Sequence, residues 1–275
     1  MPELPETETI ARDLDREISG LCISRIAVAR PDVLREVDAP LLSLRATGAT
    51  VVRCWRRAKL IILDLGTSDR VVVQPRFSGA LLLDDGTLTE RERRYVTVSF
   101  GLSDGRSLHY RDIRRLGTLS LMGSQRFQAY ASALGIEPLD PETDAEQLSG
   151  LLRASRQAIK KVLMDQRQIA GIGNIYANEA LWRAGIDPSR AADSVNADES
   201  TRLYLGIVSV LRESIAARGT SFRDYRDASG QPGQFAAQLA VYGRAGRPCT
   251  KCGARLVGTH AVDGRSTVFC ARCQS

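Results

Sequence analysis

The first half of the chain shows an amphipathic stripe followed by many short apolar runs. Ile10, Leu14 and Ile18 recur at four-residue spacing, which predicts a helix that ends near Gly20. The runs after it are rich in Val, Ile and Leu, are bounded by turn residues, and predict strands. Their ranges are 23–28, 49–55, 60–65, 71–74, 80–83, 95–100, 108–110 and 118–122. A series of strands without intervening helices favours a sandwich or barrel over a parallel sheet.

From Ser124 onward the apolar spacing becomes helical. The predicted helices span 125–134, 145–152, 155–165, 175–183 and 197–217. Pro138 and Pro141 indicate a linker between domains, and the Gly-, Ser-, Asp- and Arg-rich stretch 219–233 predicts a mobile loop. We therefore expect an α+β chain of several domains, divided at 1–130, 131–236 and 237–275.

Composition changes this picture little. The chain has 275 residues, of which 43% are hydrophobic and 25% charged, as is usual for a globular protein. It has no run of about 18 apolar residues that would predict a membrane span, and its acidic start is not typical of a secretion signal. A net charge of +6 and a pI near 9.2 are compatible with a polyanion partner. Two basic loops, 53–59 and 111–115, interrupt the strands, and solvated loop charge is the simpler interpretation of any single arginine there.

The first residues carry candidate chemistry. Removal of Met1 would leave Pro2 with a free secondary amine, which can attack an electrophilic carbon and become a charged iminium. An α-amine titrates near pH ~8, so part of it is neutral at neutral pH. Glu3 is an adjacent candidate for proton transfer. The structural alternative is that Pro5 only begins a helix, and the two interpretations are compatible.

A glycine-rich turn precedes the predicted helix 175–183. Gly171 and Gly173 permit a tight turn, and the free amides at a helix start favour an anion such as phosphate. A plain corner between two helices is the alternative interpretation of this segment.

The cysteines near the end of the chain form two Cys-x-x-Cys pairs. Such spacing turns four thiolates towards one point and predicts a closed tetrahedral zinc site. The pairs are Cys249 with Cys252 and Cys270 with Cys273. Two disulfides or four buried thiols are the alternatives, and the absence of an export signal favours zinc. The segment between the pairs predicts a hairpin whose tip carries Arg265, whereas Cys22 and Cys54 are expected to be buried thiols.

Taken together, these motifs closely resemble the formamidopyrimidine-DNA glycosylase family, bacterial repair enzymes that excise oxidised purines. The matching segments lie in the family's order and span nearly the whole chain. They are Pro-Glu-Leu-Pro-Glu at 2–6, Arg-Ala-Lys at 57–59, residues 171–179, Val-Tyr-Gly-Arg at 241–244 and the four cysteines. The resemblance implies an N-terminal helix on a β-sandwich, a helix–two-turn–helix module and a four-cysteine zinc finger.

The resemblance also implies roles. Pro2 would attack C1′ of the damaged nucleotide and Glu3 would assist proton transfer, so that the base is expelled and the strand is cut by β,δ-elimination. Lys59, Asn174 and Arg265 match positions that grip phosphates, and Arg115 is a possible further DNA contact. Arg114 matches the arginine that fills the space left by the flipped base. The expected partner is double-stranded DNA with oxidised bases or abasic sites, bound by a monomer at the bacterial nucleoid in the cytoplasm.

The sequence departs from the family in the two loops around that arginine. Gln74 and Phe77 stand where the family usually has His and Met, and Ile113 and Leu116 replace the Pro and Phe of Pro-Arg-Arg-Phe. We therefore expect the intercalating aromatic residue to be Phe77, with Leu116 as a smaller wedge. Two alternatives stay open: an endonuclease VIII-like enzyme for oxidised pyrimidines, and a zinc-dependent protein that binds damaged DNA without cutting it.

Overall fold

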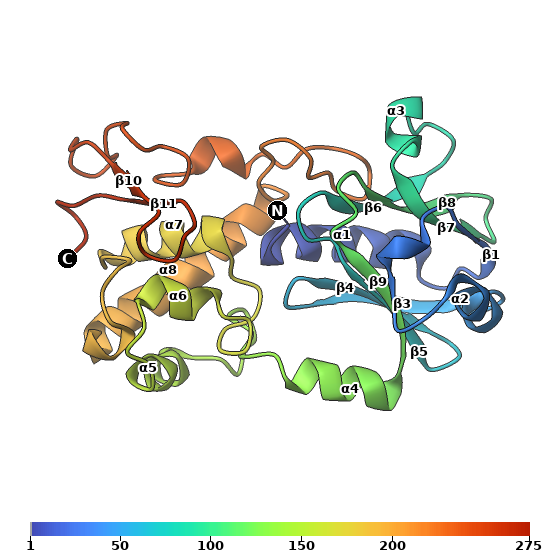
Figure 1. Ribbon diagram of the computed structural model, residues 1–275, viewed down its shortest axis with the longest axis horizontal. Coiled ribbons are helices and arrows are strands. Elements are labelled where there is room, and N and C mark those ends of the chain that lie inside the picture. Colours follow the sequence, from blue (N-terminus) through green and yellow to red (C-terminus); the bar gives the residue numbers. More distant parts are fainter. Residues whose placement is uncertain (1) are drawn as a thin grey trace. The chain divides into compact units, whose positions relative to one another are not determined.

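The computed structural model describes residues 2–275, which form two compact units. One comprises the residues up to 132 together with 215–236, and the other comprises 133–214 and 237–275. Figure 1 gives the order of the elements. The loop 219–233 therefore belongs to the same compact unit as the N-terminal residues. The division into three domains, 1–130, 131–236 and 237–275, stays a prediction.

The first unit contains helix α1 (Leu4–Ile18) and two largely antiparallel sheets. In spatial order, the five-stranded sheet is β2 (Leu34–Arg35), β9 (Thr118–Gly123), β5 (Asp69–Gln74), β4 (Leu60–Leu65) and β3 (Val51–Arg57). The four-stranded sheet is β1 (Ile23–Val28), β7 (Val96–Leu102), β8 (Ser107–Asp112) and β6 (Gly79–Asp84). Each of the eight strands that the apolar runs predict is present.

A single apolar core joins α1 to both sheets. The predicted stripe of Ile10, Leu14 and Ile18 is fully buried in this core. Val71 of β5 and Phe100 of β7 belong to the same cluster, so the two sheets form a sandwich that shares its core with the helix. Pro5 lies in the first turn of α1 and Gly20 follows its end, as predicted.

Several short elements were not predicted. Helix α2 (Ala39–Ala46) begins at Asp38, whose side chain accepts a hydrogen bond from the amide of Leu41 at 2.8 Å. Helix α3 (Glu90–Arg93), the 3₁₀ turn η1 (Pro31–Val33) and the short strand β2 are further examples. The prediction of two basic loops was partly wrong, because residues 53–57 lie in β3 and residues 111 and 112 end β8. Helix α4 (Ser124–Ser132) packs Phe127 edge-on against Trp55, with 5.6 Å between ring centroids.

The second unit is helical and ends in a small hairpin. Its elements are α5 (Ala145–Arg153), α6 (Ile159–Met164), α7 (Asn174–Ala184), η2 (Ala192–Ser194), most of α8 (Ala197–Ala216), part of η3 (Phe235–Gln238), β10 (Val257–Thr259) and β11 (Thr267–Phe269). The predicted helices are therefore present, although α6 is shorter than expected. Among residues 2–275, none of the helices is both long and apolar enough to cross a membrane.

Candidate active site

The first turn of α1 is organised around a buried carboxylate. Pro2 is buried, and Glu3, which is 1% exposed, is the residue that caps the helix. The amide of Glu3 donates to Oε2 of Glu6 at 2.8 Å, and the amide of Thr220 donates to Oε1 at 2.7 Å. Glu6 itself is fully buried. Because both of its oxygens accept a backbone hydrogen bond, one side chain fixes the start of α1 and the start of the loop 219–233.

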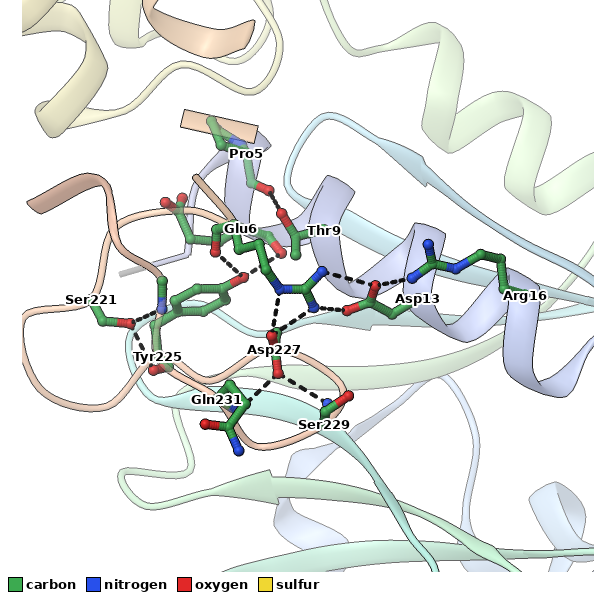
Figure 2. Close-up of polar contacts among 12 residues, drawn as sticks. Pro5, Glu6, Thr9, Asp13, Arg16, Ser221, Tyr225, Asp227, Ser229 and Gln231 are labelled. Atoms are coloured by element: carbon green, nitrogen blue, oxygen red, sulfur yellow. Dashed lines mark hydrogen bonds and ion pairs between the residues drawn. The ribbon is translucent and has the colours of Figure 1, made fainter. Parts of the chain in front are cut away.

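The same loop is attached to α1 by an ion network. Arg218 is paired with Asp13 of α1, and its Nε donates to Oδ2 of Asp227 at 2.8 Å. Hydrogen bonding to Asp13 and then to Asp227 raises the pKa of Arg218 above its usual value. Asp227, which is 1% exposed, also accepts from the amides of Ser229 and Gln231. Figure 2 shows these contacts between the helix and the loop.

Tyr225, a residue of this loop, is buried in the apolar core of the first unit. Its hydroxyl donates to the carbonyl oxygen of Arg218 at 3.1 Å, and its carbonyl oxygen accepts from the hydroxyl of Ser221 at 3.0 Å. Burial, followed by the nearby charge of Glu6, raises the pKa of the Tyr225 phenol. The phenol therefore stays neutral and serves as a hydrogen-bond donor to the backbone next to the loop and to that of α1 (Figure 2).

Lys59 lies in the tight turn between β3 and β4. The turn needs a left-handed residue, which is Ala58 at φ 53°. On the adjoining strand, Nε of Arg56 donates to Oε2 of Glu8 at 2.7 Å. Burial raises the pKa of Glu8, but Arg56 and Arg12 lower it more, so the carboxyl titrates below its usual range. This ion pair connects the Lys59 turn to α1, the helix that follows Pro2 and Glu3.

The structure brings Phe77 and Arg114 together. The guanidinium of Arg114 lies over the Phe77 ring, 4.8 Å from its centroid. Phe77 and Leu116 are 45% and 44% exposed, which is unusual for large apolar residues in this chain. Two loops thus present an aromatic ring, an arginine and a leucine to solvent, and we call these three residues the wedge group.

A buried carboxylate holds the two wedge loops in place. Oδ1 of Asp112 accepts from the Ser78 hydroxyl at 2.6 Å, and Oδ2 accepts from the amide of Gly117 at 2.8 Å. A Cβ on Gly117 would lie only 2.1 Å from the hydroxyl oxygen of Tyr110, so only glycine fits there. Arg115, at φ 54°, instead pairs with the exposed Asp32 at 3.0 Å. Hydrogen bonds to Asp112 therefore hold the backbone that carries the wedge group, whereas the wedge side chains are exposed.

In the second unit, the structure brings Asn174 next to the hairpin that carries Arg265. Nδ2 of Asn174 donates to the carbonyl oxygen of Ser266 at 3.0 Å. Oδ1 of Asn178, one turn further along α7, accepts from the amide of Val268 at 2.7 Å. Arg265 is exposed at the hairpin tip, adjacent in sequence to Ser266. Two of the predicted phosphate contacts, Asn174 and Arg265, therefore form one surface.

Three side chains, two of them fully buried, support that surface. Lys160 is fully buried, and its ammonium donates to the Thr267 hydroxyl at 2.7 Å and to Asp263 at 3.3 Å. Gln166 closes the glycine turn, because its Oε1 accepts from the amide of Gly171, which has φ 87°. Glu179 is also fully buried, and it accepts three backbone amides in the segment before the finger. Those amides belong to Ala240, Val241 and Tyr242.

The four C-terminal cysteines form a cluster suited to binding a metal ion. All four sulfur atoms lie within 4.8 Å of one another, and none is in a disulfide. The Sγ atoms of Cys249 and Cys273 are 4.0 Å apart, and those of Cys252 and Cys270 are 3.5 Å apart. A tetrahedral site with bonds of about 2.3 Å requires sulfur atoms about 3.8 Å apart. The donor set and its spacing therefore fit such an ion, and the alternative of two disulfides is wrong.

The contacts of the buried charged residues that position these groups were not predicted from the sequence. Glu6 and Asp13, with Thr9 between them, form a polar stripe beside the apolar stripe of α1, which is a signal that helical spacing could have revealed. Lys160 interrupts an apolar helix face and was a similar signal. Arg218 gave no local sign, and Glu179 lies in the matching segment 171–179 without any sign of its contacts, because the partners of both lie far away in the sequence.

Comparisons with known proteins place these features in one family. Residues 1–119 match the model of the formamidopyrimidine-DNA glycosylase N-terminal domain, and residues 134–226 match its H2TH domain. A formamidopyrimidine-DNA glycosylase of Heliobacterium modesticaldum is 40% identical over the full length of both chains. The Fpg protein of Lactococcus lactis in complex with abasic-site DNA superposes with a TM-score of 0.91, at 31% identity over 99% of each chain. A mutant of that Lactococcus lactis protein bound to Fapy-dG DNA gives the same score and identity over 100% of both chains. The chain belongs to the formamidopyrimidine-DNA glycosylase family.

Proposed function

We propose that this chain excises oxidised purines from DNA and then cuts the strand at the resulting abasic site. The observation that carries the proposal is the Pro2-Glu3 start of α1 in a chain that matches the family over its whole length. The Lactococcus lactis neighbours, which hold abasic-site and Fapy-dG DNA, support the same substrate class. DNA of this kind lies at the nucleoid in the bacterial cytoplasm, where we expect the chain to act as a monomer.

Pro2 is the proposed nucleophile, once Met1 has been removed. Its secondary amine attacks C1′, the bond from C1′ to the base breaks, and the base leaves with the bonding electrons and a proton. The sugar ring opens to give an iminium at Pro2. The positive iminium acidifies the C2′ proton, so elimination releases first the 3′ and then the 5′ phosphate. Water then hydrolyses the remaining iminium and restores Pro2, and Glu3 carries protons in these steps.

Phosphate contacts supply most of the proposed affinity. Lys59 grips the backbone beside the lesion, and Asn174 and Arg265 form a second contact. The bond between Asn174 and Ser266 supports this pairing, because it keeps the hairpin tip beside the start of α7. Arg115 adds a weaker contact, since it already pairs with Asp32.

The wedge group stabilises DNA from which the lesion has been flipped. Phe77 stacks on the neighbouring bases, Arg114 hydrogen-bonds the orphaned base, and Leu116 only fills space. The exposure of Phe77 and its contact with Arg114 support this assignment. The aromatic residue of the wedge is thereby Phe77, in the loop before β6, whereas the family usually has it at the position of Leu116.

The metal is proposed to be zinc in a structural role. Cys249, Cys252, Cys270 and Cys273 would hold one Zn²⁺ in a closed site, because four thiolates leave no position for a substrate. When bound, the ion supplies folding free energy to the finger that presents Arg265. It takes no part in the reaction at C1′.

The test is excision from two duplexes under single-turnover conditions. One contains 8-oxoguanine opposite cytosine, and the other contains thymine glycol. The proposal predicts faster cutting of the first. Faster cutting of thymine glycol would favour the endonuclease VIII-like alternative, and tight binding with no cutting of either would favour a non-catalytic damage-binding protein.

A further inference from the structure

A cavity of about 450 Å³ lies in the first unit, beside the loop 219–233. Four of the residues that line it are arginines and two are carboxylates. The arginines are Arg91, Arg111, Arg223 and Arg226, and the carboxylates are Glu92 and Asp224. The carboxylate of Glu92 already accepts from the Thr89 hydroxyl at 2.9 Å. The lining therefore has an excess of positive charge, which favours an anion.

Arg111 is the unusual member of this set. It is only 5% exposed, although charged side chains are rarely buried unless they are paired. Among residues 2–275 its guanidinium makes one hydrogen bond, from Nη2 to the carbonyl oxygen of Asp224 at 2.7 Å, and its buried Nε has no partner. A guanidinium has five N–H donors. The guanidinium of Arg111 is therefore a buried cation, and one hydrogen bond uses only a small part of its donor capacity.

A second cavity continues the first towards the wedge loop. Both are lined by Tyr95 and Ile113, and Ile113 immediately precedes Arg114. The second cavity adds three further arginines, which are Arg30, Arg94 and Arg115. We call the two cavities together the Arg111 groove. It follows the loop that the proposed function inserts into the DNA helix.

We propose that the Arg111 groove binds the sugar–phosphate backbone of the DNA beside the wedge loop, with Arg111 as a phosphate-binding residue. The inference rests on the proposed function, because that function places DNA at the wedge group. Phosphate is the natural partner, since its oxygens match the fork of a guanidinium and carry the opposite charge. This contact is additional to those of Lys59, Asn174 and Arg265.

The experiment measures binding to a duplex that contains an uncleavable abasic-site analogue, at several salt concentrations. Wild type is compared with Arg111→Met. Loss of one phosphate contact should lower the log–log salt slope by about 0.9 and weaken binding several-fold at low salt. The Tm should stay unchanged or rise, because an apolar side chain replaces an incompletely paired buried charge. A merely structural role for Arg111 predicts the reverse, with a lower Tm and an unchanged slope.

Two further variants make the result specific. Arg91→Met removes a second groove arginine and should also lower the slope, which keeps the test valid if Arg111→Met folds poorly. Arg106→Met removes the same charge near the opposite end of β8, about 16 Å along the strand, where Arg106 pairs with Glu17 and Asp104. That distance exceeds the screening length of about 8 Å at physiological salt, so its slope should match wild type.

The outcomes separate the two proposals. If wild type binds and cuts damaged DNA while Arg111→Met and Arg91→Met keep its slope and affinity, the groove proposal is overturned and the function stands. If wild type does not bind the duplex, the proposed function fails and the groove proposal fails with it. Inorganic phosphate tests whether the groove binds a free anion. If phosphate raises the Tm of wild type but not of Arg111→Met, and if the two proteins bind DNA equally, the groove holds a small anion and not DNA.

Discussion

The carboxylate of Glu6 accepts a hydrogen bond from the backbone amide of Thr220, 214 positions later in the chain, at 2.7 Å. The other oxygen of Glu6 holds the amide of Glu3. The loop 219–233, which the resemblance to the family implies covers the flipped purine, is therefore attached through Glu6 to the residue next to the proposed nucleophile. Arg218 strengthens the attachment by pairing with Asp13 of α1.

Loss of this attachment should affect excision of the damaged base more than cutting of the strand at an abasic site. Arg218→Ala leaves Asp227 without its cation and leaves Asp13 with Arg16 alone, and these two carboxylate side chains are 1% and 7% exposed. We expect a loss of about 1–3 kcal/mol in the free energy of unfolding, reduced from the value for a fully buried pair because Arg218 is 41% exposed. Excision of 8-oxoguanine should slow more than cutting at a preformed abasic site, where no base needs to be covered.

The matched control is Arg126→Ala. Arg126 pairs with Glu36, and both side chains are about half exposed, so its loss should change stability by about 0–1 kcal/mol. Chemical denaturation and single-turnover cutting of both substrates provide the readouts. Equal slowing on the lesion and on the abasic site in Arg218→Ala would contradict a role for the loop in holding the base.

The effects of replacing Phe77 and Leu116 can be compared directly, because the two side chains do not differ in burial. Phe77 and Leu116 are almost equally exposed, so Phe77→Ala and Leu116→Ala should have similarly small effects on the Tm. Stacking on a base is worth roughly 1–3 kcal/mol, and only the aromatic ring can provide it. We expect Phe77→Ala to slow excision from an 8-oxoguanine·cytosine duplex more than Leu116→Ala does.

Arg114 should affect the choice of opposite base as well as the rate. Arg114→Ala removes the donors for an orphaned cytosine, and it should weaken excision and reduce the preference for cytosine opposite the lesion. All three wedge variants should still cut an abasic site. A Phe77→Ala protein with wild-type excision beside a strongly impaired Leu116→Ala protein would show that the aromatic wedge has not been transferred.

The cysteine cluster predicts a link between metal content and DNA affinity. Cys249→Ser should lower bound zinc well below one ion per chain and weaken DNA binding, because the ion helps the finger to fold. Arg265→Ala should weaken binding while zinc stays in place. Metal analysis and binding to the abasic-analogue duplex distinguish the two effects, and full zinc occupancy in Cys249→Ser would rule out the four-cysteine site.

Local patterns in the sequence explain much of this fold. The stripe of α1, the strands of the sandwich and the spacing of the cysteines each depend on a few neighbouring residues, and the structure has all three. Helix α2 was also within reach, because Asp38 is a favourable residue at a helix start and Pro40 suits the first turn.

The parts that could not be predicted depend on contacts between distant residues. The pattern around Arg111 is typical of a solvated loop, yet the residue ends β8 and is buried. The pairing of Arg218 with Asp13 joins positions 205 residues apart. The contact of Arg114 with Phe77 needs the two wedge loops to be side by side, which follows from sheet topology and not from either loop's sequence.

Pro2 is proposed to form a covalent bond with the damaged sugar. The most direct measurement is to incubate Met1-processed protein with an 8-oxoguanine·cytosine duplex and borohydride, which reduces the iminium, and to locate the trapped nucleotide by mass spectrometry of the digested adduct. We expect an adduct on Pro2, and we expect Pro2→Gly to lose most excision while it keeps DNA binding. An adduct on a lysine such as Lys59, or normal turnover by homogeneous protein that retains Met1, would contradict it.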